Sequence, residues 1–332
     1  MGTRGLVGIE NLGCTCYLAA VVQCIAHCPT LITLLMRSSM TGPVTDALKE
    51  LCVAKWAVHA TSAVSPEAMV RALRGYKGSC IDYDNQNDSH EFLVELMTAI
   101  EGEVGAPRSS VVEQGTSSRP GSLRVLLQRM ASHWDATVTA NQCPLTQAMY
   151  GQFVFLTQCQ ECKHVTQSFD VFSSLPVLFD ETATTASVQQ HADQVWASSE
   201  SIEGYQCDHC NNKSLARREC KISRMPDVLV VHAMRFADGD RKMTKDLHAE
   251  HEIDVSAAQL QVGPRCDREL YRLRGMVCHR GMSRHGGHYY AVCKCTSMKN
   301  WVGFDDDAVT MMEDRSGVRK GDPYLLIYER SS

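Results

Sequence analysis

Residues 8–23 read GIENLGCTCYLAAVVQ, and this stretch decides the fold. It begins as a loop containing glycines and continues from Cys16 as an apolar helix, which we expect to end at Pro29. Because the dipole and free N–H groups of a helix N-terminus stabilise negative charge, Cys16 stands where a thiolate nucleophile would be placed. Asn11, earlier on the same loop, has a side-chain N–H that can donate to a developing oxyanion. Taken alone, the segment fits a half-buried structural cysteine better than a catalytic one.

A histidine and an acidic turn in the C-terminal half would supply the partners of a nucleophilic cysteine. His288 follows a pair of glycines at the start of a predicted strand, and Asp305 lies in the run WVGFDDD at residues 301–307. A cysteine peptidase uses a histidine to take the thiol proton and a third polar group to hold the imidazole. A strand, a turn and a returning strand would bring Asp305 to the far nitrogen of His288. In isolation, the first motif is more typical of a core histidine, and the second of a solvated acidic turn, than either is of a catalytic site.

Two C-x-x-C pairs, CQEC at residues 159–162 and CDHC at residues 207–210, predict a metal site. Each pair offers two thiolates from a tight turn, so two pairs fill the tetrahedral coordination of one zinc ion. A filled sphere leaves no position for water, so this zinc would be structural, clipping together a two-strand projection with an inserted helix. The alternative is a set of unrelated buried cysteines, and His164, His209 and Cys220 are nearby substitute ligands. The predicted ligands are Cys159, Cys162, Cys207 and Cys210.

The composition is that of an ordinary globular protein and narrows the functional classes. The chain has 332 residues, 44% of them hydrophobic and 21% charged, and a net charge of -5. This charge argues against a nucleic-acid-binding protein, whose surface would be basic. No apolar run approaches the roughly 18 residues of a membrane span, and the N-terminus lacks the apolar core of a signal peptide. We therefore expect a cytoplasmic or nuclear protein whose 16 cysteines serve metal binding or catalysis.

The order of the predicted elements indicates an α+β fold. A second helix follows Asp88, which fits a capping box with Glu91; its apolar face runs from Phe92 to Ile100, and Gly102 is expected to follow the helix. Residues 105–121 are rich in Gly, Ser and Pro, which predicts a mobile surface insertion. Beyond them strands are predicted at residues 150–157, 165–172, 226–236, 287–293 and 324–328. A helical N-terminal part is thus followed by a strand-rich C-terminal part.

Together these segments are similar to the conserved blocks of the ubiquitin-specific proteases. Residues 8–23 resemble the cysteine box of that family, and QNDSHEF at residues 86–92 resembles its second block. The C-x-x-C pairs fall where the family has its finger ribbon, and residues 226–236 resemble its P-x-V-L-x-x-H-x-x-R-F strand. The histidine box is matched at residues 279–281, 287–289, 301–306 and 324–328. The blocks occur in the family's order and cover essentially the whole chain.

The resemblance implies a fold and an activity. The fold would be the papain-like cysteine protease fold of this family, of α+β class and shaped like a hand. Residues 1–332 would form a single catalytic domain, without room for a targeting domain, divided into a helical thumb (about residues 1–149), zinc-ribbon fingers (about 150–225) and a β-sheet palm (about 226–332). The activity would be deubiquitination, the thiol-dependent cleavage of the bond after the C-terminal glycine of ubiquitin. Its partners would be ubiquitin, ubiquitinated proteins and a separate targeting or activating protein.

By the same resemblance, each catalytic role falls on one residue. Cys16 is the expected nucleophile, His288 the general base and then acid, and Asp305 the residue that orients His288. Asn11 is the expected oxyanion donor, together with the backbone N–H of Cys16. Asp306 is a second acidic residue expected to support the same site.

Three further residues are expected to contact the substrate. The tail of ubiquitin, which ends in a diglycine, would enter a channel between thumb and palm that is too narrow for a Cβ atom. Asp88 and Glu91 would lie along this channel, facing the arginines and backbone amides of the tail, and Tyr289 would form part of its wall. Helix capping is the alternative explanation for Asp88 and Glu91, and both explanations can hold at once.

The sequence departs from the family pattern close to the nucleophile. Cys14 stands where the family commonly has Asn, residues 18–20 are Leu-Ala-Ala rather than Met-Asn-Ser, and Asn87 replaces a Gln of the second block. No catalytic group is lost. One hypothesis is that Cys14 traps a sulfenic acid formed on Cys16 and so makes oxidation reversible. The alternative is a small residue tolerated in the loop.

Two other functions remain open. The catalytic motifs contact only what diglycine-tailed modifiers share, so the substrate could be another ubiquitin-like modifier. The chain could also be a catalytically silent ubiquitin-binding scaffold, although it keeps the whole triad and Asn11. Electrophilic probes made from different modifiers test the first alternative, and turnover tests the second.

Overall fold

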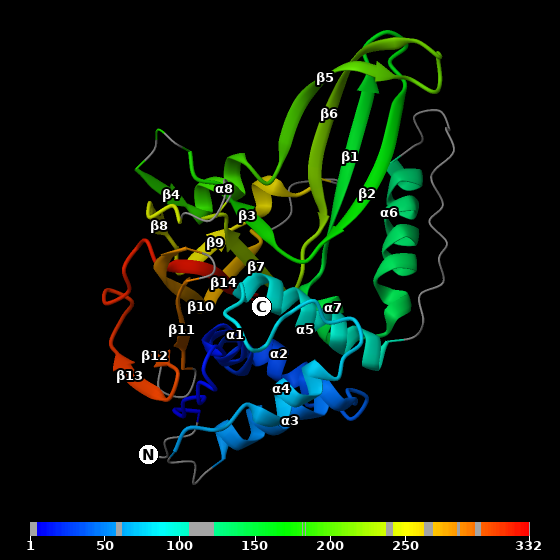
Figure 1. Cartoon of the computed structure of the whole chain (residues 1–332). Helices are drawn as coiled ribbons and strands as arrows, with labels where there is room; N and C mark the ends of the chain where they lie inside the picture. The colour runs from blue at the N-terminus through cyan, green and yellow to red at the C-terminus, as the bar shows by residue number, and fades with distance from the viewer. Residues whose placement is uncertain are drawn as a thin grey trace.

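The computed structural model describes residues 5–57, 62–105, 123–180, 182, 184–236, 242–261, 268–283, 286–295 and 300–331. The predicted mobile insertion, apart from Gly105, lies outside the described residues. Figure 1 shows a group of N-terminal helices, a large sheet beside them and a narrow second sheet that projects away from both. The mixed α+β class predicted from the sequence is confirmed. No single helix among the described residues is long and apolar enough to cross a membrane. The helices α1 (Cys16–Ala26) and α2 (Pro29–Leu35) pass by length and composition only as a pair, which is bent by 94°.

The N-terminal part is helical, as predicted. Its helices are α1 Cys16–Ala26, α2 Pro29–Leu35, α3 Pro43–Trp56, α4 Glu67–Arg74, α5 Ser89–Val104, α6 Leu123–Thr137 and α7 Pro144–Met149. Every residue of α1 is buried, because this helix packs between α5 and strands of the large sheet. Pro29 follows the end of α1 and is also the first residue of α2, where its fixed φ suits a helix start and its missing N–H costs nothing.

Helix α5 begins at the predicted cap. The carboxylate of Asp88 accepts hydrogen bonds from the backbone N–H groups of His90 (2.7 Å) and Glu91 (3.2 Å), which confirms Asp88 as the N-cap. The helix continues through Gly102 to Val104, so the prediction that Gly102 follows the helix is wrong. A glycine costs an interior helix position only about 1 kcal/mol, which burial of the apolar face of α5 outweighs.

The large sheet, called here the palm sheet, is built mainly from the C-terminal half of the chain. Its strands are β3 Leu175–Val177, β7 Val228–Ala233, β9 Glu252–Asp254, β10 Leu270–Ser283, β11 Gly286–Lys294, β12 Trp301–Asp305, β13 Ala308–Met312 and β14 Pro323–Arg330. They lie in the order β13-β12-β11-β10-β14-β7-β3, with β9 pairing on β10. All neighbours are antiparallel except β3 and β7. The strands predicted at residues 226–236, 287–293 and 324–328 are confirmed as β7, β11 and β14.

The palm sheet separates two hydrophobic clusters. Successive residues of β11 alternate between them, as strand geometry requires. Tyr289 and Ala291 belong to the cluster around α1, and Tyr290 and Val292 belong to the cluster on the opposite face. The sheet is therefore buried on both sides, and the end of β11 that carries His288 is held against α1.

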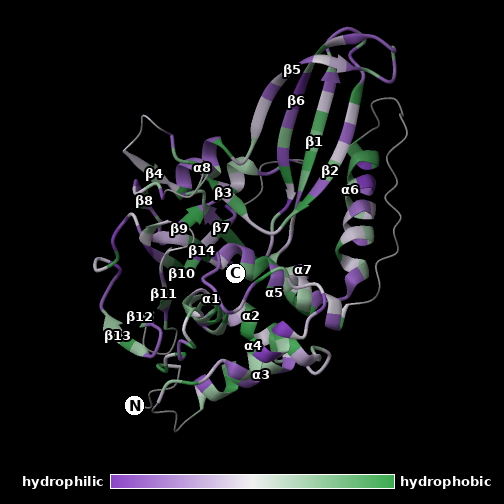
Figure 2. Cartoon of the chain, in the orientation of Figure 1, coloured by the Kyte–Doolittle hydropathy of each residue, from purple (hydrophilic) through white to green (hydrophobic). Residues whose placement is uncertain are grey.

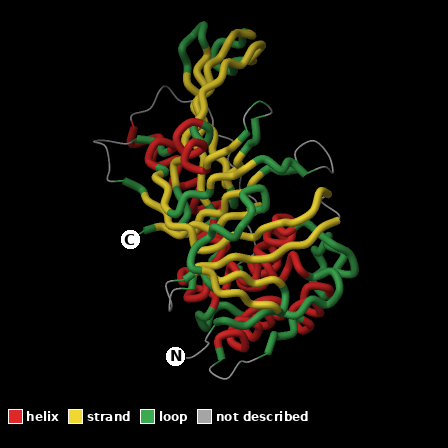
Figure 3. Tube along the Cα trace, turned by 90° about the vertical axis from the view of Figure 1, so that its left-hand side faces the viewer, coloured by secondary structure: helices red, strands yellow, loops and turns green. Residues whose placement is uncertain are grey.

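The projecting sheet, called here the finger sheet, has four strands in the order β2-β1-β6-β5 (Figures 1 and 3). They are β1 Gly151–Cys159, β2 Val165–Phe172, β5 Ser198–Gln206 and β6 Lys213–Arg224. The predicted strands at residues 150–157 and 165–172 are confirmed as β1 and β2, but the expected two-strand projection is wrong. Strand β5 is polar and exposed along its length, and Figure 2 shows hydrophilic and hydrophobic residues in bands along the finger strands. The strands that complete the sheet therefore lack the alternation that reveals a strand in sequence.

A short helix does lie between the two cysteine pairs in the sequence, as expected. It is α8 Val188–Gln194, which packs on β9 and on the 3-10 turn η2 Ser256–Ala258. A two-stranded sheet lies next to it, formed by β4 Thr185–Ser187 and β8 Asp246–His248. Helix α8 thus belongs to the surroundings of the palm sheet.

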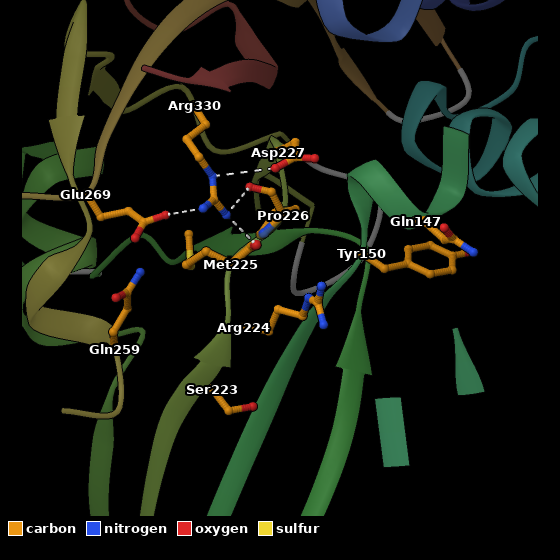
Figure 4. Close-up of a pocket in the computed structure, with 10 residues that line it drawn as sticks. All are labelled: Gln147, Tyr150, Ser223, Arg224, Met225, Pro226, Asp227, Gln259, Glu269 and Arg330. Atoms are coloured by element: carbon orange, nitrogen blue, oxygen red, sulfur yellow. Dashed lines mark hydrogen bonds and ion pairs between the residues drawn. The ribbon is translucent and has the colours of Figure 1, made fainter. Parts of the chain in front are cut away.

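Arg330 of β14 joins the finger sheet to the palm sheet. Figure 4 shows it beside a polar cavity of about 320 Å³. Its Nη2 donates to the carbonyl oxygens of Met225 (2.6 Å) and Pro226 (3.1 Å). Its Nη1 lies 2.8 Å from Oε1 of Glu269, and its Nε lies 3.6 Å from Oδ1 of Asp227. One side chain thereby fixes the short segment in which the chain passes from β6 to β7.

Candidate active site

The loop before α1 is held in shape by Asn11. The side-chain oxygen of Asn11 accepts hydrogen bonds from the backbone N–H groups of Gly13 (3.0 Å) and Thr15 (3.1 Å). Gly13 has a φ of 113°, a conformation that favours glycine. Cys16 is consequently the first residue of α1 and is 2% exposed, at a helix end that favours a thiolate. Cys14 is partly exposed, and its trapping of an oxidised Cys16 stays a prediction.

Strands β11 and β12 bring His288 and Asp305 to the same end of the palm sheet. The two strands are antiparallel neighbours, and Nε2 of His288 is hydrogen-bonded to Oδ1 of Asp305. The pKa of His288 is raised to about 9, first by its hydrogen bond with Cys16 and then by Asp305, against the opposing effect of burial. The structure thus brings Cys16, His288 and Asp305 together and favours the charged imidazolium form of His288.

Asp306 connects the cysteine loop to this pair of strands. It lies in the turn between β12 and β13 with a φ of 53°, and its carbonyl oxygen accepts a hydrogen bond from the backbone N–H of Ile9 at 3.0 Å. Its carboxylate accepts a hydrogen bond from Nδ2 of Asn11 at 2.9 Å and lies 4.0 Å from Nε2 of His288. A Cβ atom on Gly8 would lie 2.5 Å from the carbonyl oxygen of Asp306, so the close approach of loop and turn requires glycine there. Burial raises the pKa of Asp306.

Gln86, the first residue of the QNDSHEF segment, holds the backbone next to His288. Its Nε2 donates to the carbonyl oxygen of Gly287 at 2.8 Å, and its Oε1 accepts from the N–H of Gly287 at 3.1 Å. A Cβ atom on Gly287 would lie 2.4 Å from Nε2 of His279 in the neighbouring strand β10. The close approach of β10 and β11 at this point therefore also requires glycine. Sequence reasoning missed the role of Gln86, because a side chain that binds backbone leaves no pattern of its own. Its place in the QNDSHEF segment was the only signal.

The four predicted zinc ligands meet at the far end of the finger sheet. Their sulfur atoms all lie within 4.8 Å of one another, with separations of 4.0 Å for Cys159 and Cys210 and 3.7 Å for Cys162 and Cys207. Zinc–sulfur bonds of about 2.3 Å in a tetrahedron give sulfur–sulfur edges of about 3.8 Å. The cluster therefore fits a structural zinc site.

The two cysteine turns are built in the same way. The N–H of Lys163 donates to the carbonyl oxygen of Cys159 at 3.0 Å, and the N–H of Asn211 donates to that of Cys207 at 2.8 Å. Lys163 and Asn211, each directly after the second cysteine of its pair, have φ values of 60° and 59°. Unrelated buried cysteines would not share this geometry. Cys220 lies on β6 outside the cluster.

Comparison with protein families matches residues 7–328 to the family described as ubiquitin carboxyl-terminal hydrolase. The chain belongs to this family. Human ubiquitin carboxyl-terminal hydrolase 21 is 25% identical over 355 residues, covering 98% of this chain and 61% of the relative. Human ubiquitin carboxyl-terminal hydrolase 2 is 25% identical over 346 residues, covering 99% of this chain and 56% of the relative. The chain thus spans about three fifths of the length of these human relatives.

Solved structures share the fold of this chain. A chain in the SAGA DUB module of Ubp8, Sgf11, Sus1 and Sgf73 bound to monoubiquitin superimposes with a TM-score of 0.75 at 20% identity, covering 100% of this chain and 71% of that chain. A chain in a structure of the yeast SAGA DUB module gives a TM-score of 0.73 at 20% identity, with coverages of 100% and 70%. These similarities confirm the fold expected from the sequence.

The three residues that the sequence predicts to contact a substrate differ in exposure. Glu91 is exposed. Asp88 is 4% exposed, and its second carboxylate oxygen accepts a hydrogen bond from the hydroxyl of Tyr324. Tyr289 is also buried, and its ring lies 4.6 Å from that of His279. The geometry supports the capping role of Asp88, and contact of these three residues with ubiquitin stays a prediction.

Lys55 is a residue near the site that the sequence did not single out. Its side chain is fully buried in α3, and its Nζ donates to the carbonyl oxygens of Gly5 (2.7 Å) and Val7 (2.8 Å). The same nitrogen lies 4.2 Å from the ring centroid of Phe304, the neighbour of Asp305 in β12. Burial lowers the pKa of Lys55 to about 7. A lysine within an amphipathic helix looks like a surface residue in sequence, so nothing in the pattern could have revealed this position.

Proposed function

We propose that this chain is a thiol-dependent deubiquitinase that hydrolyses the peptide or isopeptide bond after the C-terminal glycine of ubiquitin. The observation that carries the proposal is the meeting of Cys16, the first residue of α1, with His288, which is hydrogen-bonded to Asp305 and whose pKa is raised to about 9 by Cys16 and Asp305. Support for ubiquitin as the substrate comes from the description of the family and from a structural neighbour bound to monoubiquitin.

The reaction would be acyl transfer through a thioester. The thiolate of Cys16 attacks the carbonyl carbon of the terminal glycine, which forms a C–S bond and a tetrahedral oxyanion. As the C–N bond breaks, the imidazolium of His288 gives its proton to the departing amine. His288 then takes a proton from a water molecule whose oxygen attacks the thioester, and the thiolate leaves as ubiquitin is released with a free carboxyl group. Asp305 holds the imidazole throughout.

In this mechanism Asn11 would stabilise the oxyanion. Its oxygen is used within the cysteine loop, and one hydrogen of its Nδ2 is donated to Asp306 at 2.9 Å. The second hydrogen of Nδ2 is left for the substrate oxygen, together with the backbone N–H of Cys16. Because Asp306 already fixes the amide, this donor would need no reorganisation during the reaction.

The proposal includes one structural zinc ion bound by the four clustered cysteines. Their spacing matches a tetrahedral site, and four ligands would leave no open position for a substrate. The ion would join the turn after β1 to the turn after β5 and so stiffen the end of the finger sheet. It would take no part in the chemical step.

A partner protein that targets or activates the enzyme is a further part of the proposal. Its support is that the structural neighbours named above lie in a module with other proteins. Location in the cytoplasm or nucleus stays a prediction from the sequence alone.

Hydrolysis of a ubiquitin C-terminal fluorogenic amide tests the proposal. The purified chain is assayed with reductant present, beside Cys16→Ala as the matched inactive control. We expect turnover by the wild type that the substitution abolishes. Bound ubiquitin without turnover would indicate a scaffold or an enzyme that requires an activator. Labelling of Cys16 only by the probe of another diglycine-tailed modifier would replace ubiquitin with that modifier.

A further inference from the structure

Arg280 lies opposite His288 in the palm sheet and contacts the same carboxylate. Strands β10 and β11 pair so that Arg280 and His288 face each other. Nη1 of Arg280 donates to Oδ2 of Asp305 at 3.2 Å, while Oδ1 of Asp305 is hydrogen-bonded to His288. One carboxylate oxygen of Asp305 therefore contacts His288, which titrates, and the other contacts Arg280, which is always charged.

The guanidinium of Arg280 is itself fixed by the palm sheet. It lies over the ring of Tyr290, 4.1 Å from the centroid, and its Nε is 3.8 Å from Oδ2 of Asp322. Asp322 is buried, and the same oxygen accepts a hydrogen bond from the hydroxyl of Tyr290 at 2.8 Å. A planar group contacted on its face and at two of its nitrogens has little freedom to move, so Nη1 is held beside Asp305.

Asp305 needs such a partner because its side chain is 43% exposed. A half-exposed carboxylate is hydrated, and rotation about its side-chain bonds would turn Oδ1 away from His288. The rate depends on the imidazole keeping a narrow range of positions relative to the thiol. We propose that Arg280 is a positioning residue of the catalytic triad, which occupies Oδ2 of Asp305 and so keeps Oδ1 directed at His288. This inference rests on the proposed function.

The contact adds little to the stability of the fold. The side chains of Arg280 and Asp305 are about half exposed, and ion pairs in water-accessible positions contribute only weakly. Variants at position 280 are therefore expected to fold, and their defects to lie in the chemical step.

Steady-state hydrolysis of the ubiquitin amide is compared in wild type, Arg280→Gln, Arg280→Lys and Arg272→Gln. Arg272 is the matched control, because it lies near the other end of β10 and forms an exposed ion pair with Glu252 at 2.9 Å. We expect Arg280→Gln to lower kcat about tenfold with KM unchanged. Arg280→Lys should lose less, since an ammonium group can still donate to Asp305, and Arg272→Gln should match the wild type.

A double-mutant cycle separates positioning from a merely structural role. If Arg280 acts through Asp305, Arg280→Gln should cost nothing further in an Asp305→Ala background, whereas independent effects would multiply. The proposal is overturned if Arg280→Gln lowers kcat by the same factor in both backgrounds, or if its kcat equals that of Arg272→Gln.

Alkylation of Cys16 by iodoacetamide separates this inference from the proposed function, because it reports thiolate reactivity without ubiquitin. The rate is followed on Cys16 by mass spectrometry at about pH 6. Arg280→Gln and Asp305→Ala should each slow the reaction, and the double variant should be no slower than Asp305→Ala. Faster alkylation of the wild type than of Arg280→Gln, in a wild type that neither binds ubiquitin nor hydrolyses the amide, would reject the substrate while leaving Arg280 supported. Equal rates in wild type and Arg280→Gln would reject positioning whatever the substrate.

Discussion

At the scale of single residues, the proposed mechanism predicts that the charge of His288 sets the pH range in which Cys16 reacts. The pKa of His288 is raised to about 9, so its imidazolium persists through neutral pH and is lost as the pH rises through that value. We expect kcat/KM to fall above about pH 9, because the departing amine then lacks its proton donor. Asp305→Ala removes a hydrogen bond and a charge that raise this pKa, so its alkaline limb should lie at lower pH. Profiles of kcat/KM for the ubiquitin amide check this, and coincident alkaline limbs would contradict it.

A second prediction at the scale of single residues concerns Asn11. Asn11→Ala removes the side-chain N–H that we propose as a donor to the oxyanion, so kcat should fall by roughly 10²–10³ with a smaller change in KM. Because the oxygen of Asn11 also holds the loop at Gly13 and Thr15, Asn11→Asp is the matched variant: it keeps an acceptor and loses the N–H. Steady-state kinetics of both variants should give comparable losses. Near-normal kcat in Asn11→Asp would show that the loop contacts matter and the donor does not.

Some candidate site residues could be predicted from the sequence, because their type and their neighbours in the chain match a known pattern. Cys16 stands at a loop-to-helix junction and His288 follows paired glycines, but each pattern alone fits a structural residue better, and it is the resemblance to the family's ordered blocks that names both. Arg280 and Gln86 could not be named in this way, because their contacts depend on strand register and on a segment folded back over two hundred residues away.

At the scale of elements, zinc should hold the end of the finger sheet together. Cys210→Ala removes one of the four clustered thiols, so we expect loss of bound zinc and a Tm lower by roughly 5–10 °C. Cys220→Ala is the matched control, since Cys220 lies on β6 outside the cluster. Zinc per chain is measured by atomic emission and Tm by calorimetry. An unchanged zinc content in Cys210→Ala would rule out the four-cysteine site.

The start of α5 carries another prediction. Asp88 caps this helix and accepts from Tyr324 of β14, so Asp88→Ala should lower the free energy of unfolding by about 1–3 kcal/mol. Glu91→Ala, at an exposed position three residues on, should cost less than about 1 kcal/mol. Urea unfolding of both variants gives the comparison. A raised KM in Asp88→Ala without loss of stability would favour contact with the ubiquitin tail over capping.

Helices and strands whose hydrophobic residues form a clear pattern along the sequence could be predicted, and those without such a pattern could not. Helix α1 and strands β2 and β7 follow from their apolar residues. Strand β5 reads SSESIEGYQ and is exposed along its length, so only its pairing with β6 makes it a strand. The finger sheet was therefore only half predictable from the chain.

At the scale of the whole molecule, the cysteine loop and the palm sheet are joined by the N-terminal segment. The N–H of Ile9 donates to the carbonyl oxygen of Asp306 at 3.0 Å, and Gly8 accepts from the N–H of Val64 at 3.0 Å. Lys55 ties residues before this point to α3 and contacts Phe304 of β12. Cys16, His288 and Asp305, far apart in the chain, are thus brought together by the assembly of helices and palm sheet as one unit.

Lys55 makes the stability of this assembly depend on pH. Burial lowers its pKa from 10.5 to about 7 in the folded protein, so between these values the unfolded chain binds the proton and the folded chain does not. Raising the pH through this window therefore favours folding, by at most about 1.4 kcal/mol per pH unit. Lys55→Met should lack this pH-dependent contribution to the free energy of unfolding. The difference in free energy of unfolding between wild type and Lys55→Met should therefore change with pH. Lys49→Met, on the same helix at a partly exposed position, should run parallel to the wild type. Urea unfolding at about pH 7, 8 and 9 measures the slopes, and a Lys55→Met slope equal to that of the wild type would mean that Lys55 keeps its proton when buried.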